Sequence, residues 1–264
     1  MYRPLQIPYL LSKGFLERIK FTEYIVPELS DYLICMWESE SYADATGSIH
    51  EVTIVDGCIS LVVDKTNKYI GYAGLSKTDF NMEVIMPDRH IGFRFKPGAF
   101  YALTGLEATV AINTFLSIEM VDANFDKLSF FKLSDEAMKK FLIDYFIRLS
   151  EKAKSMSYIH LFEEISAKNF SDAESLYNFI GFSPSQAQRI FKKHYGLTPK
   201  KILSIIRFQH CLAELLQESP EKMSLLNSYY DQSHFISDFK RNIGLTPIEF
   251  INLKNQRRDE FFLS

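Results

Sequence analysis

Apolar and polar residues alternate along the first third of the chain. From Phe21 to Lys96, apolar side chains mostly recur at every second position, which is the period of a half-buried β-strand. Two such runs, 49–54 and 59–63, flank Asp56-Gly57, a dipeptide typical of a two-residue β-hairpin turn. The alternation ends at Pro97-Gly98. The pattern predicts a small antiparallel sheet or barrel.

After Pro97 the apolar period lengthens to that of a helix. Ser134 is a good N-cap, and the residues that follow it place one apolar stripe along a helix: Met138, Phe141, Leu142, Tyr145 and Leu149. The stripe fits either packing on the protein's own sheet or a contact between two copies in a homodimer. Phe146 and Ile147 widen the apolar surface, which is the sequence's one hint of a second contact.

One stretch of the C-terminal part occurs twice. Ser183 to Pro199 returns as Asp231 to Pro247, and both copies end in Gly-Leu-Thr-Pro. Phe191 matches Phe239 at an offset of 48 residues, and the Gly-Leu-Thr-Pro runs keep the same offset. A constant offset is the mark of a repeated supersecondary unit. The chain therefore contains two copies of one unit.

The first copy carries the local signals of two short helices. Ser183 is a good N-cap, Pro184 fits the first helical position, and Gln186 completes a capping box. Upstream, Ser171-Asp-Ala-Glu174 is a second capping box, for a short helix that ends at Gly181. A helix, a tight turn and another helix make a helix-turn-helix unit.

These motifs resemble those of the AraC/XylS family of bacterial transcription regulators. The resemblance covers about Ile165 to Leu253 and is carried by Gly181-Phe-Ser-Pro-Ser185, Arg189, Phe191-Lys192 and the matching residues 229–247. It implies two helix-turn-helix units, at about 172–195 and 222–243. One long helix, at 199–217, would join them.

The N-terminal part also resembles a known domain. Val55 to Leu61 and Gly92 to Gly98, and more weakly Pro27 to Trp37, are similar to the sensor domain of a subgroup of AraC-like regulators. We therefore expect an α+β chain. Residues 1–160 form a sensing or oligomerisation domain with a small antiparallel sheet or barrel and helices. Residues 161–264 form an all-helical AraC-type DNA-binding domain.

Charge divides unevenly between the two parts. Residues 1–165 hold 17 Lys and Arg against 23 Asp and Glu, whereas residues 166–264 hold 13 against 10. An acidic N-terminal part is unsuited to contact with DNA, and the basic excess of the C-terminal part suits it. The resemblance implies double-stranded DNA and RNA polymerase as partners.

The resemblance places DNA contacts on the second helix of each unit. Arginine and glutamine can each grip a base edge with two hydrogen bonds, and we predict base contacts from Ser185, Gln188, Arg189, Gln232 and Ser233. Other basic side chains would contact phosphates, which position the protein without reading sequence: Lys192, Lys193, Lys200, Lys201, Lys240 and Arg241. The alternative for these residues is a solvated helix face.

The second unit departs from the family pattern. Ser228 stands at a usual glycine, Asn227 at a usual apolar residue and Ser237 at a usual arginine, and Asp238 adds a negative charge nearby. We expect this unit to position the protein more than it reads bases. An alternative function is a protein–protein interaction module, a co-regulator whose degenerate second unit no longer reads DNA.

Aromatic residues near the end of the sheet indicate where a small-molecule effector would bind. An apolar pocket in the N-terminal domain would draw on six of them: Trp37, Phe80, Phe93, Phe95, Phe100 and Tyr101. An aromatic core accounts for the same residues equally well.

Other function classes find thin support. No apolar run approaches the ~18 residues of a membrane helix, and the start of the chain lacks a secretory signal, so we expect a cytoplasmic protein with no membrane partner. The three cysteines are far apart, at no metal-ligand spacing. Catalysis would need to draw on a few polar residues of the sheet domain, where no catalytic motif occurs: His50, Glu51, Asp56, Cys58 and His90. We expect no enzyme, no cofactor and no metal.

Overall fold

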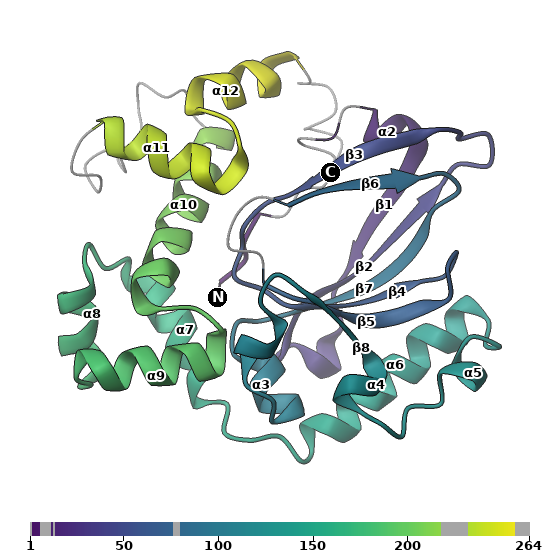
Figure 1. Ribbon diagram of the computed structural model, residues 1–264, viewed down its shortest axis with the longest axis horizontal. Coiled ribbons are helices and arrows are strands. Elements are labelled where there is room, and N and C mark those ends of the chain that lie inside the picture. Colours follow the sequence, from purple (N-terminus) through teal and green to yellow (C-terminus); the bar gives the residue numbers. More distant parts are fainter. Residues whose placement is uncertain (1, 6–11, 13, 76–79, 218–231, 257–264) are drawn as a thin grey trace.

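The protein is α+β, as the sequence predicts. The computed structural model describes residues 2–5, 12, 14–75, 80–217 and 232–256. Within these residues, all strands lie before Ile118, and the chain after it is helical (Figure 1).

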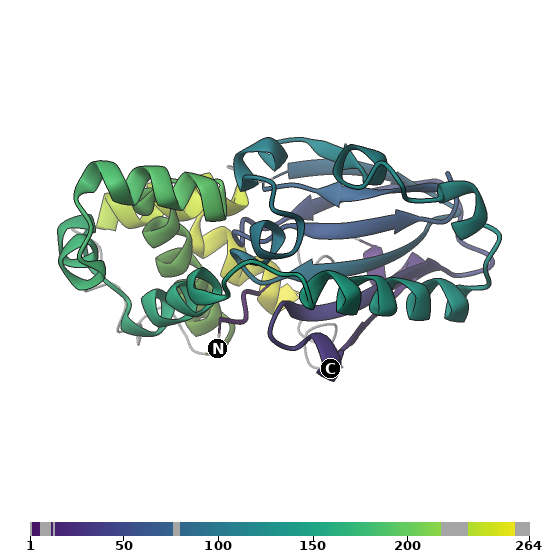
Figure 2. The same cartoon turned by 90° about the horizontal axis from the view of Figure 1, so that it is seen from below.

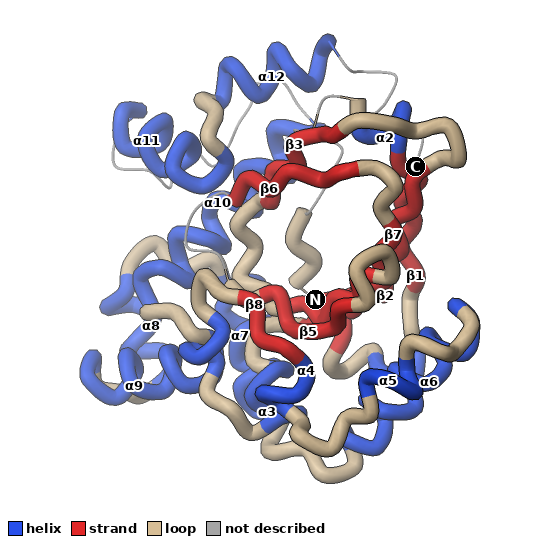
Figure 3. The backbone as a smooth tube through the Cα atoms, turned by 45° about the vertical axis from the view of Figure 1, so that its right-hand side comes forward, coloured by secondary structure: helices blue, strands red, loops and turns tan. Residues whose placement is uncertain are grey.

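The N-terminal part holds two antiparallel sheets. The larger has six strands in the order β1-β2-β7-β4-β5-β8, and the smaller pairs β3 with β6. Figure 3 shows β3 and β6 on the far side of the N-terminal part from β5 and β8. The strands are β1 (Ile19–Tyr24), β2 (Leu33–Ser41), β3 (Ser48–Thr53), β4 (Ser60–Asp64), β5 (Tyr69–Ala73), β6 (Phe80–Ile85), β7 (Arg89–Phe95) and β8 (Phe115–Ser117).

The turn at Asp56-Gly57 does not close a hairpin. β3 pairs with β6, and β4 pairs with β5 and β7, so the strands on either side of this turn lie in different sheets. The turn itself forms: Asp56 Oδ1 accepts a hydrogen bond from Cys58 N at 2.8 Å, and Gly57 has φ of 75°, which glycine adopts readily. The predicted hairpin is wrong because a turn dipeptide does not specify which strands pair.

One face of the larger sheet is buried from solvent. Phe93 and Phe95 are 0% and 1% exposed, and both rings contact Phe146 of α6 (Asp135–Ser150), with centroids 5.5 and 5.0 Å away. Phe146 thus packs on the protein's own sheet, and Met138, Leu142 and Tyr145 of the stripe are buried in the same core. The other helices of this part are α2 (Phe15–Arg18), η1 (Pro27–Leu29), α3 (Ala99–Thr104), η2 (Ala108–Ala111), α4 (Ile118–Val121) and α5 (Lys127–Phe130).

The first helix-turn-helix unit forms as its caps predict. The Ser183 and Gln186 capping box is complete, and Gly181 ends the preceding helix with φ of 68°. Asp172, one residue after the expected Ser171, caps that helix by accepting from Ser175 N. The C-terminal helices are α7 (Ser157–Lys168), α8 (Ala173–Ile180), α9 (Pro184–Tyr195), α10 (Pro199–Gln217), α11 (Gln232–Ile243) and α12 (Pro247–Gln256).

The two parts of the chain share one hydrophobic core, and Figure 2 shows them side by side. Tyr2 packs edge-on against Phe162 of α7, with ring centroids 5.0 Å apart. Lys96, 6% exposed, pairs with Glu163 of α7 at 2.9 Å. A domain division at residues 160–161 falls inside α7, and residues 151–156 are the nearest break between helices.

The long helix α10 belongs to two cores. Ile202 and Ile206, in its first half, lie in the core shared with the sheets. Phe208 and Leu212 lie in a second cluster with Phe239 of α11. The first unit is thus built into the N-terminal part, whereas the second unit is attached mainly through the far half of α10.

Candidate nucleic-acid interface

The helix α9 has one buried and one open face. Ala187 and Phe191 are both 0% exposed. Ser185, Gln188 and Arg189, the three predicted base contacts of this unit, are all exposed. Because residues three and four apart share a helix face, these side chains form one polar surface. The structure therefore brings together the first group of predicted contacts.

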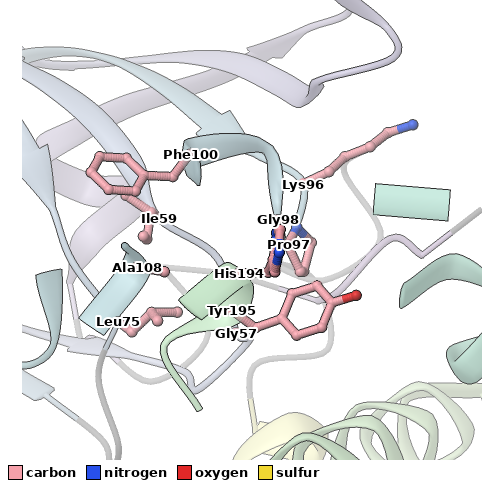
Figure 4. Close-up of a pocket in the computed structure, with 10 residues that line it drawn as sticks. All are labelled: Gly57, Ile59, Leu75, Lys96, Pro97, Gly98, Phe100, Ala108, His194 and Tyr195. Atoms are coloured by element: carbon pink, nitrogen blue, oxygen red, sulfur yellow. The ribbon is translucent and has the colours of Figure 1, made fainter. Parts of the chain in front are cut away.

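The C-terminal end of α9 is held by α7 and by Tyr101 of the N-terminal part. The His194 ring stacks on Tyr158 with centroids 3.6 Å apart and meets Tyr101 edge-on at 4.4 Å. Tyr195 donates a hydrogen bond to the carbonyl oxygen of Tyr158 at 2.6 Å. Figure 4 shows His194 and Tyr195 bordering a small pocket with residues of the sheet domain, among them Gly98. Sequence patterns miss this contact because its partners are distant in sequence.

Burial, and secondarily the charge of Lys193, lowers the pKa of His194 to about 4. The imidazole is therefore neutral in the folded protein at neutral pH. In the unfolded chain it takes up a proton at about pH 6.5. Between these two values the unfolded state binds a proton that the folded state does not, so the free energy of unfolding falls as the pH falls.

We expect this dependence to appear as a difference between the wild type and His194→Gln. From pH 7 to pH 5 the wild type should lose about 1–2 kcal/mol of stability that the variant does not lose. Chemical denaturation at both pH values measures it. The comparison also removes the contribution of Glu51, whose pKa is raised by burial to about 7 and whose effect has the opposite sign. Equal losses in the two proteins would contradict the neutral, buried His194.

The predicted phosphate contacts of the first unit and of α10 separate into two groups. Lys192 and Lys200 are exposed. The Lys193 ammonium instead lies 5.2 Å from the centroid of the Tyr101 ring, a cation–π distance. Lys201 donates a hydrogen bond to Asn242 Oδ1 at 3.1 Å, and burial lowers its pKa. Lys201 therefore joins α10 to α11, which does not fit its predicted role on phosphates.

This division predicts the salt dependence of DNA binding. Lys192→Ala should reduce the slope of log affinity against log salt by about one, the amount expected for one lost phosphate contact. Lys201→Met should leave the slope unchanged, because its ammonium already has a partner inside the protein. Binding titrations at several salt concentrations test both variants. A reduced slope in Lys201→Met would return Lys201 to the phosphate contacts.

The described contacts of the second unit lie on α11. Ser233, Lys240 and Arg241 are exposed, and Arg241 also pairs with Asp238 at 3.1 Å. Gln232 begins α11, but its side chain lies outside the described residues. The helix expected before α11, with Asn227 and Ser228, also lies outside them. Figure 1 places α9 and α11 toward opposite ends of α10.

The aspartate of α11 is not on the open face. The Asp238 side chain is 7% exposed, and its carboxylate accepts a hydrogen bond from Ser204 Oγ of α10 at 3.3 Å. Asp238 therefore points into the contact between α10 and α11, and its expected effect on DNA binding stays a prediction. Sequence reasoning missed this role.

The six aromatic residues proposed for an effector do not line one pocket. Phe93, Phe95 and Phe100 are buried in the core. Trp37 pairs with Gly92 across β2 and β7 and stacks on Phe21, which places it on the sheet face opposite Phe93. Tyr101 meets α9, and the side chain of Phe80 lies outside the described residues.

The polar residues considered for catalysis make ordinary internal contacts. His90 Nδ1 lies 2.9 Å from Asp88 Oδ2, and Asp56 lies 3.8 Å from Arg94 Nε. Within the part of the chain that the structure describes, no group of three His, Cys, Asp or Glu side chains could hold a metal ion. No described helix is long and apolar enough to cross a membrane.

Comparison with known families agrees with this arrangement. Residues 176–252 match the family described as a helix-turn-helix domain, and residues 26–117 match a domain of unknown function (DUF6597). Residues 176–252 are therefore similar to a helix-turn-helix domain. The repeated unit and the linker helix resemble those of AraC/XylS-type transcription regulators.

The chain is also similar to solved structures of ToxT from Vibrio cholerae. One, in the P21 form, is 11% identical, covers 89% of this chain and 98% of that chain, and has a TM-score of 0.39. Another, described as bound to an unsaturated fatty acid, is 8% identical, covers 89% and 94%, and has a TM-score of 0.37. No curated protein matches the chain.

Proposed function

We propose that this chain is a sequence-specific DNA-binding transcription regulator that acts in the cytoplasm. The observation that carries the proposal is the open polar face of α9, with Gln188 and Arg189 exposed opposite the fully buried Phe191. A helix anchored by one face and polar on the other suits the reading of base edges in the major groove. RNA polymerase is the further partner that a transcription regulator requires.

The two units contribute unequally in this proposal. The first reads bases through Ser185, Gln188 and Arg189. The second mostly contacts phosphates, through Lys240 and in part through Arg241, whose charge is offset by Asp238. The neutral polar start of α11, with Ser233 exposed, supports a weaker base preference in its half of the site.

The N-terminal domain would modulate DNA binding in response to a small-molecule effector. Support comes from the contact of Tyr101 with His194 and from the pocket that Gly98 and Tyr195 line together, both at the last turn of α9. A ligand that binds better to one arrangement of this contact would shift the placement of α9. Trp37 is the single tryptophan. Its emission should change with an effector in that domain, and effector and DNA should alter each other's affinity by the same factor.

Selection of binding sites from random duplex DNA by the full-length protein tests the central proposal. The expected result is enrichment of two sequence blocks about one helical turn apart, ~34 Å, with the stronger base preference in the block read by α9. Enrichment of a single block would contradict the proposal that both helix-turn-helix units contact the DNA. No enrichment at all would favour the interaction module, in which the chain binds other regulators instead of DNA.

A further inference from the structure

Four polar side chains join α10 to α11. Lys201 and Ser204 extend from α10, and Asp238 and Asn242 extend from α11; we call this group the polar seam. Lys201 Nζ donates to Asn242 Oδ1 at 3.1 Å, and Ser204 Oγ donates to Asp238 Oδ2 at 3.3 Å. Asn242 also donates to the backbone oxygen of Asp238 at 2.8 Å, which ties the two α11 residues together.

The α11 side of the seam is buried beside an apolar cluster, and its α10 side is partly buried. Asn242 is 0% exposed and Asp238 is 5% exposed, while Phe208 and Phe239 pack next to them with ring centroids 5.4 Å apart. Apolar side chains tolerate small shifts between helices, because the hydrophobic effect has no direction. Buried hydrogen bonds do not tolerate them, since a slip leaves donors and acceptors without partners. The seam therefore selects one rotation and one register of α11 on α10.

The first unit is held differently. At the matching offset of 48 residues, Ile190 replaces Asp238 and His194 replaces Asn242. His194 packs on Tyr158 and Tyr101 instead of bonding to α10. The position of α9 is thus set by the N-terminal part, whereas the position of α11 is set by α10 through the seam.

We propose that the polar seam determines which spacing between two DNA half-sites the protein accepts. The inference rests on the proposed function, in which both units contact one duplex. Each base pair added between two contacts increases their separation along the duplex axis by ~3.4 Å and rotates one relative to the other by about 35°. A second unit locked in one register matches one spacing, and a unit free to shift matches several. Asp238 and Lys201 are therefore positioning residues rather than DNA contacts.

The test uses full-length protein and duplexes in which the two selected half-sites are separated by spacers of different length. The wild type should prefer its best spacing over spacers one base pair longer or shorter by about fivefold to tenfold, the lower end of the range for one mismatched base pair, because the second unit reads bases weakly. The apolar variant Lys201→Met, Asp238→Leu, Asn242→Leu keeps the packing volume similar and removes the hydrogen bonds. In it the preference should fall to about twofold.

Three further variants distinguish a positioning role of the seam from a general loss of structure. Asp238→Asn keeps an acceptor for Ser204 and should retain the wild-type spacing preference. Ser237→Ala, an exposed neighbour on α11, should also retain it. Ser204→Ala, a smaller change, should give an intermediate preference, and it tests the seam even where the triple variant fails to fold.

Thermal melting, monitored by circular dichroism, identifies the folded variants. A folded triple variant, or Ser204→Ala in its place, that keeps the full wild-type preference would overturn the role of the seam while leaving the proposed function intact. Uniform weakening at every spacing would also overturn it, since that is the effect of a purely structural role. A wild type that selects no half-sites would count against the proposed function itself.

Discussion

Arg189→Ala is expected to weaken binding to the selected DNA site by about 1–3 kcal/mol and to relax the preference at one base pair. Arg189 is exposed on the open face of α9, and its guanidinium can hold O6 and N7 of a guanine together. Removing it takes away both hydrogen bonds to that base. Competition titrations with each of the four base pairs at every position of the site measure the change.

Lys192→Ala is the matched control for this experiment. Lys192 is exposed three residues farther along α9, and a phosphate contact carries no sequence information. It should lower affinity nearly equally for all sequences and leave every base preference in place. An Arg189→Ala protein that behaves in the same way, with unchanged preferences, would remove Arg189 from the base-reading group.

The parts of the fold that local chemistry determines could be predicted from the sequence. The capping box of Ser183 and Gln186 and the glycine end at Gly181 act within one turn of chain, so α8 and α9 appear where expected. The open face of α9 follows from the spacing of Ala187 and Phe191. These signals also make the exposed face that carries the first group of predicted base contacts readable from the sequence.

The parts that depend on distant partners could not be predicted. An Asp-Gly dipeptide favours a turn, and Asp56-Gly57 forms one. β3 pairs with β6 and not with β4, however, and the dipeptide carries no information about that pairing. Lys201 and Asp238 are charged residues, and each makes a hydrogen bond to the other helix of the pair. A charged residue is read as solvent-facing unless its partner is known.

The shared core places the N-terminal domain in direct contact with the first helix-turn-helix unit. Tyr195, 2% exposed, ends α9, touches Phe162 of α7, and lies so close to Gly98 that a Cβ added there would meet its ring at 3.3 Å. In the proposed mechanism, a change in the sheet domain reaches α9 through these direct contacts. The second unit receives such a change mainly through α10, whose seam holds α11 in place.

The same core predicts a large effect on stability from Phe162→Ala. Phe162 is 2% exposed, and its ring contacts Tyr2 at 5.0 Å and Tyr195 at 5.4 Å. Truncating a buried phenylalanine removes its apolar contacts and leaves a cavity, which costs about 3–5 kcal/mol. Because Phe162 is in the helical part and Trp37 is in the sheet, the fluorescence of Trp37 during denaturation reports whether the two parts unfold together.

We expect Phe162→Ala to move the Trp37 transition to a clearly lower denaturant concentration, since one core joins the two parts. Phe239→Ala is the matched control. Phe239 is 0% exposed but lies in the second cluster, against Phe208 and Phe250. Its removal costs a similar amount locally, and the Trp37 transition should move much less. An unchanged Trp37 transition in Phe162→Ala would mean that the sheet domain unfolds independently of α7, and the direct route from that domain to α9 would then fail.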